Sequence, residues 1–222
     1  MEEHVVKILE ISSVTHNVNR YVVEKPGNYS FESGQATEVV INKEGWKDER
    51  RPFTFTGLNE WDNLEFTIKS YIDHKGVTNK LLELKQGDEF ILHDVWGAIQ
   101  YKGEGIFIAG GAGVTPFIAI FRALQKKGQI KNNKLIFANK TENDIILKDE
   151  FSEMLKDNFI NILSDEKTSA YHHGFITKEF LQKYIDNKQS KFYVCGPPPM
   201  MDAVQKILNE LSVGKDAVVV EL

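Results

Sequence analysis

Residues 106–124 read IFIAGGAGVTPFIAIFRAL, and this stretch decides how the chain around it folds. An apolar run ends in a glycine turn, and a second apolar run with helical spacing follows. Gly111 and Gly113 have no Cβ, so backbone N–H groups of the turn can approach a pyrophosphate, and a helix beginning near Thr115 directs its positive end at the same charge. Pro116 suits the first helical turn, where no N–H donor is needed. The alternative is a turn that only packs a helix on a sheet.

Strands and helices alternate from residue 103 to residue 222. This alternation predicts a doubly wound parallel sheet with helices on both faces. The strand-like runs are 105–110, 133–140, 158–165, 191–196 and 216–222, and the helical runs are 116–128, 147–157, 177–186 and 199–211. A loop is expected at His172 and His173, which lack further ligands at a metal-binding spacing, so no metal site is expected.

The first hundred residues have a different pattern. Short runs rich in Val, Ile, Phe, Thr and Tyr are separated by turn-rich segments, which predicts a closed antiparallel barrel of the Greek-key kind. Residues 77–88 break this pattern with three leucines on a short helix, for which Thr78 is the expected N-cap. The two patterns meet near residues 101–105, so we expect two domains, residues 1–102 and residues 103–222.

Composition excludes several classes of function. Cys195 is the single cysteine, so the sequence cannot form an internal disulfide, a four-cysteine zinc site or a cysteine-ligated iron–sulfur cluster. The net charge of −5 argues against a nucleic-acid partner. No apolar run approaches the ~20 residues of a membrane span. The first residues, MEEHVVKILE, lack a secretory pattern, so a cytoplasmic location is expected, and the oligomeric state is left open.

Cys195 lies in FYVCGPPPM, residues 192–200, at the carboxyl end of a predicted strand. Parallel sheets bind ligands beyond these ends, so Cys195 is expected to face the same crevice as the glycine turn. Gly196 and three prolines form a stiff loop with few N–H donors. Such a loop can line one side of a site for a flat ring. The alternative for Cys195 is a small buried apolar residue.

Three motifs, in this order, resemble those of the ferredoxin–NADP reductase family: RPFT at 51–54, GGAGVTPF at 110–117 and YVCGPPPM at 193–200. Gly76-Val-Thr is a weaker fourth match. The resemblance covers nearly the whole chain. It implies FAD on the barrel, NAD(P)H as the substrate of the second domain, and hydride transfer from the nicotinamide to the flavin.

The resemblance also implies roles for single residues. Arg51 would pair with flavin phosphate, Phe53 would stack on the isoalloxazine where the family has tyrosine, and Thr54 would lie near the flavin nitrogen that accepts hydride. Cys195 would position the nicotinamide, and Glu221 matches a glutamate near the family's C-terminus. The implied catalytic set is Thr54, Cys195 and Glu221. The implied cofactor-binding set is Arg51, Pro52, Phe53, Thr54, Ile68, Lys69, Gly76, Val77, Thr78, Gly111, Gly113, Thr115, Pro116, Lys140, Cys195, Gly196, Pro197 and Met200.

The C-terminus departs from the family pattern, and the end of one predicted strand bears on the choice between NADPH and NADH. Plant-type members end in a tyrosine that covers the flavin, and the sequence here ends in DAVVVEL. The predicted strand at 133–140 ends without the acidic residue that binds an NAD ribose, and Lys140 there could meet a 2′-phosphate, so NADPH is slightly favoured over NADH.

The expected function is that of an FAD-dependent NAD(P)H oxidoreductase. A flavin accepts a hydride and can release electrons singly, so the expected partner is a ferredoxin, a flavodoxin or an oxygenase component. Free-flavin or quinone reduction is one alternative, and a nucleotide-sensing protein without turnover is another. Docking of an acidic partner would need a basic patch, for which Lys43, Lys47, Arg50, Lys75 and Lys80 are candidates.

Overall fold

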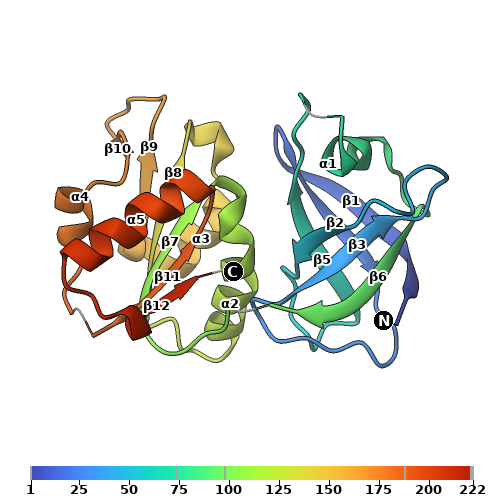
Figure 1. The fold of residues 1–222 in the computed structure, drawn as a ribbon, viewed down its shortest axis with the longest axis horizontal. Helices are drawn as coiled ribbons and strands as arrows, with labels where there is room; N and C mark the ends of the chain where they lie inside the picture. Colours follow the sequence, from blue (N-terminus) through green and yellow to red (C-terminus); the bar gives the residue numbers. More distant parts are fainter. Residues whose placement is uncertain (1, 74, 98, 188, 221–222) are drawn as a thin grey trace. The chain divides into compact units, whose positions relative to one another are not determined.

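The computed structural model describes residues 2–73, 75–97, 99–187 and 189–220 (Figure 1). Contacts between Cα atoms divide the chain into two compact units. The first consists of Met1–Gln100 and Thr115–Ala123, and the second of Tyr101–Val114 and Leu124–Leu222. Most of the helix that follows the glycine turn therefore groups with the first unit, although its sequence lies within the second half of the chain.

The first unit contains a six-stranded antiparallel sheet with the strand order β4-β3-β6-β1-β2-β5. A bridge between Phe55 and Phe66 joins the chain just after β4 to β5, so the two edges of the sheet meet and a barrel closes. The strands are β1 (His4–Thr15), β2 (Val18–Glu24), β3 (Ala36–Ile41), β4 (Arg51–Thr54), β5 (Asn63–Lys69) and β6 (Glu89–Trp96). The antiparallel Greek-key barrel predicted from the sequence is confirmed.

The barrel interior is filled by aromatic and branched side chains. Tyr21, Phe55, Phe66 and Phe90 are fully buried there, because alternate residues of each strand point inward. The short helix α1 (Val77–Lys80) and the 3-10 turn η1 (Leu81–Glu83) add apolar side chains to this core. The Tyr21 hydroxyl donates to the Leu81 carbonyl at 3.1 Å, which ties this segment to β2.

The second unit contains a six-stranded parallel sheet with the order β10-β9-β8-β7-β11-β12. Its strands are β7 (Gly105–Gly110), β8 (Lys134–Asn139), β9 (Phe159–Leu163), β10 (His172–His173), β11 (Lys191–Cys195) and β12 (Val218–Val220). The doubly wound parallel sheet is confirmed. The loop predicted at His172 and His173 is wrong, because these residues pair with Ile162 and Leu163 as a short edge strand.

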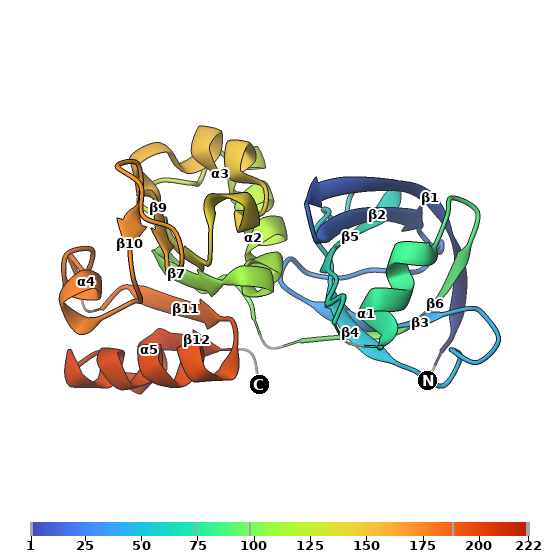
Figure 2. The ribbon, with the colours of Figure 1, turned by 90° about the horizontal axis from the view of Figure 1, so that it is seen from above.

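Helices cover both faces of this sheet. Figure 2 shows α3 (Lys148–Leu155) on one face and α5 (Pro198–Glu210) on the other. Val204 and Leu208 of α5 pack with Ile108 of β7 and Val194 of β11. The helix predicted at 177–186 is shorter in the structure, α4 (Lys178–Gln182), and begins at Thr177, whose side chain accepts a hydrogen bond from the Phe180 N–H.

The strand order creates a topological switch point between β7 and β11. From β7 the chain adds β8 and β9 on one side, whereas β11 and β12 lie on the other side. Ligands of open parallel sheets bind beyond the carboxyl ends of the two strands at such a point. Those ends carry the glycine turn and Cys195.

Candidate active site

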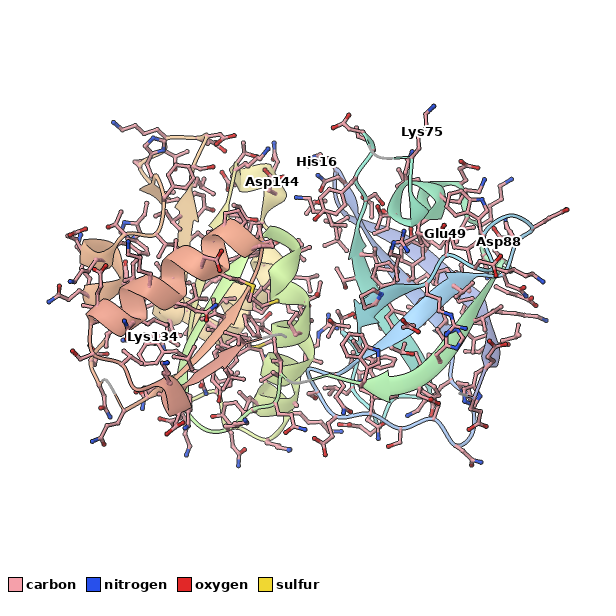
Figure 3. The ribbon with its side chains drawn as sticks, in the orientation of Figure 1. His16, Glu49, Lys75, Asp88, Lys134 and Asp144 are labelled. Carbon is pink, nitrogen blue, oxygen red and sulfur yellow. The ribbon has the colours of Figure 1, made fainter. Side chains whose placement is uncertain are left out.

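The RPFT motif forms β4 and pairs with β3 in the barrel. Thr54 is buried, Phe53 is half-buried against the barrel core, and Pro52 and Arg51 are exposed. The Arg51 guanidinium donates to Glu49 Oε2 at 3.0 Å and to the Arg50 carbonyl at 2.6 Å. Glu49 lies in the segment just before β4 (Figure 3). An anion bound by Arg51 would therefore compete with Glu49 for the guanidinium.

The end of β5 provides a second set of groups. Lys69 is half-buried, whereas the side chain of Ile68 lies in the barrel core, so only backbone atoms of Ile68 are left to contact a ligand. The next residue, Ser70, was missed by sequence reasoning. Its hydroxyl is buried and has no hydrogen-bond partner among the described residues, and its N–H donates to the Asn17 carbonyl at 2.8 Å. A buried hydroxyl without a partner is costly unless a ligand pairs with it.

The Gly76-Val-Thr segment begins helix α1, but its cap differs from the prediction. Gly76, not Thr78, is the N-cap, and no side chain caps the helix. The Gly76 carbonyl accepts from the N–H groups of Asn79 and Lys80. The N–H groups of Val77 and Thr78 donate to no other residue in the described part of the chain, so they are available to an anionic ligand.

The glycine turn and the Cys195 loop are packed backbone against backbone in the second unit. The turn is the 3-10 segment η2 (Gly111–Val114), and Gly111 has a φ of +51°. A Cβ at Gly113 would lie 2.3 Å from the Cys195 carbonyl oxygen. A Cβ at Gly110 would lie 2.4 Å from the Met200 sulfur. These glycines are therefore required by packing, which is the structural alternative raised from the sequence, and they also leave the turn free of side chains.

Residues 195–200 form the other wall of this site. Cys195 pairs in register with Ala109 of β7, and its buried thiol is not part of a disulfide. Gly196 lies against Gly110, and Pro197 is the N-cap of α5, with Met200 half-buried in its first turn. The structure thus brings together Gly111, Gly113, Cys195, Gly196, Pro197 and Met200. Helix α2 (Thr115–Lys126) starts directly after η2, with Pro116 in its first turn.

The carboxyl end of β8 carries charged groups of both signs. Lys140 is exposed, as a residue that meets a phosphate would be. Sequence reasoning found no acidic residue here, but Glu166 Oε2 accepts from the Glu142 N–H at 2.7 Å. Glu166 lies 24 residues from Glu142 in the sequence, so no local pattern could reveal the contact.

Glu142 belongs to a polar cluster at the same strand end. Its carboxylate accepts hydrogen bonds from Lys148 and from the Tyr171 hydroxyl, and these bonds lower the pKa of Glu142. The same ion pair raises the pKa of Lys148. The amide of Asn139, the last residue of β8, is buried and has no hydrogen-bond partner in the described chain. The segment at the end of β8 thus carries a buried amide without a partner and, just beyond it, a backbone N–H bound by the Glu166 carboxylate.

Comparison with known proteins agrees with this architecture. A family model for the oxidoreductase NAD-binding domain matches residues 107–206. The chain is 29% identical over 217 residues to NADH-cytochrome b5 reductase 2 of Mycosarcoma maydis, covering 88% of this chain and 62% of the fungal protein. Its fold matches that of a ferredoxin NADP+ reductase from Neisseria gonorrhoeae with bound FAD and NADP, with a TM-score of 0.84, 17% identity and coverage of 99% and 98% of the two chains. The resemblance to the ferredoxin–NADP reductase family that the three motifs predict is confirmed.

Reductase components of oxygenases are also relatives of the chain. The chain is 29% identical over 211 residues to the reductase component of propane 2-monooxygenase from Mycolicibacterium goodii, covering 87% of this chain. It spans 59% of the length of that protein, and about three fifths of the length of the fungal reductase. The likeness therefore supports the two-unit core that these proteins share with it.

Three further sequence predictions concern metal binding, a membrane span and Glu221. Among the described residues no group of three or more ligating side chains could hold a metal ion, and none of the described helices is long and apolar enough to cross a membrane. Glu221 lies outside the described residues.

The candidate basic patch on the first unit is largely neutralised. Lys43 pairs with Asp88, Arg50 with Glu38, and Lys80 with Glu83. Lys75 points away from the barrel (Figure 3). Three of the five cations proposed for a basic patch are therefore paired with carboxylates.

Proposed function

We propose that the chain is an FAD-dependent NAD(P)H oxidoreductase that passes electrons to a separate acceptor protein. The observation that carries this proposal is the packing of the glycine turn against the Cys195 loop at the switch point between β7 and β11. Residues 1–102 would form the FAD-binding domain and residues 103–222 the NAD(P)-binding domain. The resemblance to the ferredoxin–NADP reductase family supports both assignments.

The barrel offers groups that suit a flavin dinucleotide. The free N–H groups of Val77 and Thr78, together with Gly76, would bind its pyrophosphate, and Arg51 would form a charge-assisted pair with phosphate oxygen. Phe53 would lie along the ring, and the backbone of Pro52, Ile68 and Lys69 would border it. Thr54 and the unpaired Ser70 hydroxyl would hydrogen-bond to the polar edge of the ring. When bound, the flavin supplies the capacity to accept a hydride and to release electrons one at a time.

The second unit would bind and orient the nucleotide. N–H groups at Gly111 and Gly113, with Thr115 and Pro116 at the start of α2, would receive the pyrophosphate. Gly196, Pro197 and Met200 would restrict the nicotinamide ring to one face, because this loop is stiff and packed on the glycine turn. Cys195 would hold the ring in position, and Glu221 would complete the catalytic set with Thr54.

We infer that NADH is preferred to NADPH, which reverses the slight preference taken from Lys140. The Glu166 carboxylate accepts a hydrogen bond from the Glu142 N–H just beyond the end of β8, where an acidic group favours a ribose 2′-hydroxyl and repels a 2′-phosphate. Lys148 forms its ion pair with Glu142. A ratio of kcat/KM for NADPH to that for NADH above one would contradict this inference.

The acceptor is proposed from the relatives' names: a b-type cytochrome or an oxygenase component, with a ferredoxin or a flavodoxin as further members of this class. A free flavin or a quinone is the alternative acceptor. A nucleotide-sensing protein without turnover is the alternative from another class.

An absorbance experiment tests the proposal. The purified chain, incubated with FAD and freed of excess, should be yellow, and anaerobic NADH should bleach its flavin band. Cytochrome b5, a ferredoxin, a flavodoxin, free FMN and a quinone would then be compared as acceptors. A protein that binds nucleotide but no flavin would support the sensor, and bleaching followed by reduction of FMN or quinone alone would support the alternative reductase.

A further inference from the structure

A buried ion cluster anchors helix α2 to the barrel. Arg122, on α2, donates from Nη1 to the Thr56 carbonyl at 2.9 Å and to Glu65 Oε1 at 2.6 Å. The side chain of Arg122 is 14% exposed and that of Glu65 is 4% exposed. Thr56 and Glu65 are backbone partners as well, because the Thr56 N–H donates to the Glu65 carbonyl at 2.9 Å. One side chain of α2 therefore bonds to both segments that close the barrel.

Every oxygen of the Glu65 carboxylate is paired. Oε1 also accepts from the Thr56 hydroxyl at 2.8 Å, and Oε2 accepts from Arg20 Nε at 2.6 Å. Arg20 is in turn paired with Glu10 at 2.7 Å, so two arginines meet two carboxylates. Burial alone would raise the pKa of Glu65, but Arg122 and Arg20 outweigh it and lower the pKa below its ordinary value. The cluster is thus charged and internally balanced.

The turn between β4 and β5 is shaped around the Arg122 side chain. The guanidinium lies 5.6 Å from the centroid of the Trp61 ring, within the range of a cation–π contact. Trp61 in turn lies against Gly57, where an added Cβ would come within 2.8 Å of the ring. A lysine at 122 could provide the charge but not the planar guanidinium that lies over the Trp61 ring.

The cluster connects the two motifs that carry the proposed function. Thr56 lies two residues beyond Thr54, at the end of the RPFT strand. Arg122 lies two helical turns beyond Thr115, where the glycine turn passes into α2. Thr115, the first residue after the glycine turn, thus lies on the same helix as Arg122, and residues Thr115–Ala123 of that helix belong to the first unit together with Thr56 and Glu65.

We propose that Arg122 is a positioning residue, which fixes α2 on the strand that carries Thr54 and thereby sets the rate of hydride transfer rather than flavin affinity. This inference rests on the proposed function. Arg122 bonds to Thr56 and Glu65, so its effect would pass through the backbone of Thr56 and through α2.

Stopped-flow reduction of the FAD-loaded chain by saturating NADH tests the inference. Arg122→Met keeps the apolar stem and removes the guanidinium, and we expect the reduction rate to fall at least tenfold while the FAD Kd changes less than twofold. Arg122→Lys should recover part of the rate, and Glu65→Gln should slow it as Arg122→Met does. Gln125→Met, on the exposed side of the same helix, is the matched control and should reduce at the wild-type rate.

Three results separate failure of this inference from failure of the proposed function. If wild type is bleached by NADH and Arg122→Met is reduced at the same rate, with only its Tm lowered, the cluster is merely structural and the inference fails. If Arg122→Met does not fold, wild-type rates in Arg122→Lys and Glu65→Gln would overturn it equally. If wild type itself binds no FAD or is not bleached, the proposed function fails instead.

Discussion

The Cys195 carbonyl oxygen lies 2.3 Å from the point where a Cβ on Gly113 would stand. Real Cβ atoms do not approach backbone oxygen so closely, and the oxygen belongs to the end of β11, which cannot move independently of the sheet. The neighbouring strand therefore requires a glycine at position 113, whatever a bound ligand requires. The two motifs at the switch point form one packed structure.

Gly113→Ala should destabilise the second unit and weaken nucleotide binding. The new methyl group must displace the glycine turn or the Cys195 loop, and overpacking of this kind costs about 1–3 kcal/mol. Urea unfolding would measure the free energy of unfolding, and fluorescence titration would measure the NADH Kd. Gly214→Ala is the matched control, because Gly214 has a φ of −65° and no atom within 4 Å of its added Cβ. Equal stability of the two variants would show that the turn relaxes freely.

The fold could be predicted from the sequence because its signals are local. The alternation in residues 51–58 and the strand–turn–helix pattern at 106–124 each reflect side-chain spacing within one element. The cap of α1 was predicted wrongly because Thr78 has a capping side chain but lies inside the first turn, with Gly76 in the extended conformation before it. A two-residue edge strand such as β10 is too short to have a periodic pattern.

The site was only partly predictable, since several of its contacts join distant residues. Ser70 has an unremarkable position in TIKSY, and only burial shows that its hydroxyl lacks a partner. Arg122 and Glu65 lie 57 residues apart, and Glu142 and Glu166 lie 24 apart. No motif relates such pairs, because their meeting depends on how whole strands and helices pack.

Arg51→Ala should yield a protein that loses FAD. Removal of a charge-assisted pair to phosphate costs about 2–3 kcal/mol, which corresponds to roughly tenfold to a hundredfold in FAD Kd. Glu49→Gln should have the opposite sign, because Glu49 now holds the guanidinium in an exposed pair worth about 0.2–1 kcal/mol. Equilibrium dialysis of both variants measures the two shifts. Unchanged FAD affinity in Arg51→Ala would remove Arg51 from the flavin site.

Ser70→Ala should stabilise the flavin-free chain and weaken its hold on FAD. The unpaired buried hydroxyl costs about 1–3 kcal/mol in the free protein, and a ligand that hydrogen-bonds to it recovers that energy. Thermal unfolding without FAD and a titration with FAD give the two quantities separately. A variant that gains stability while its FAD Kd stays constant would mean that the hydroxyl does not face the flavin.

Cys195→Ser should keep its fold and its FAD but reduce the flavin more slowly. The substitution is nearly isosteric, and the thiol is buried beside the glycine turn where the nicotinamide is proposed to lie. A loss of at least tenfold in the stopped-flow rate corresponds to about 1.4 kcal/mol of barrier. The wild-type rate in this variant would leave Cys195 as a packing residue.

Glu65→Gln should weaken the pH dependence of the free energy of unfolding at acid pH. The pKa of Glu65 in the folded chain is lowered from its ordinary value of 4.5, so between the two values the unfolded chain binds more protons and stability rises with pH. The contribution is therefore fully present above pH 4.5 and is lost as pH falls through the folded pKa. The glutamine variant lacks this contribution at every pH, and breaking a buried pair of this kind costs about 3–5 kcal/mol at neutral pH. Its free energy of unfolding should lie below that of wild type at neutral pH and approach it in acid.

Urea titrations from neutral to acid pH would measure the free energy of unfolding of wild type and of Glu65→Gln. Glu44→Gln, which changes an exposed loop carboxylate, is the control. Parallel curves for wild type and Glu65→Gln would mean that the two arginines do not hold Glu65 ionised.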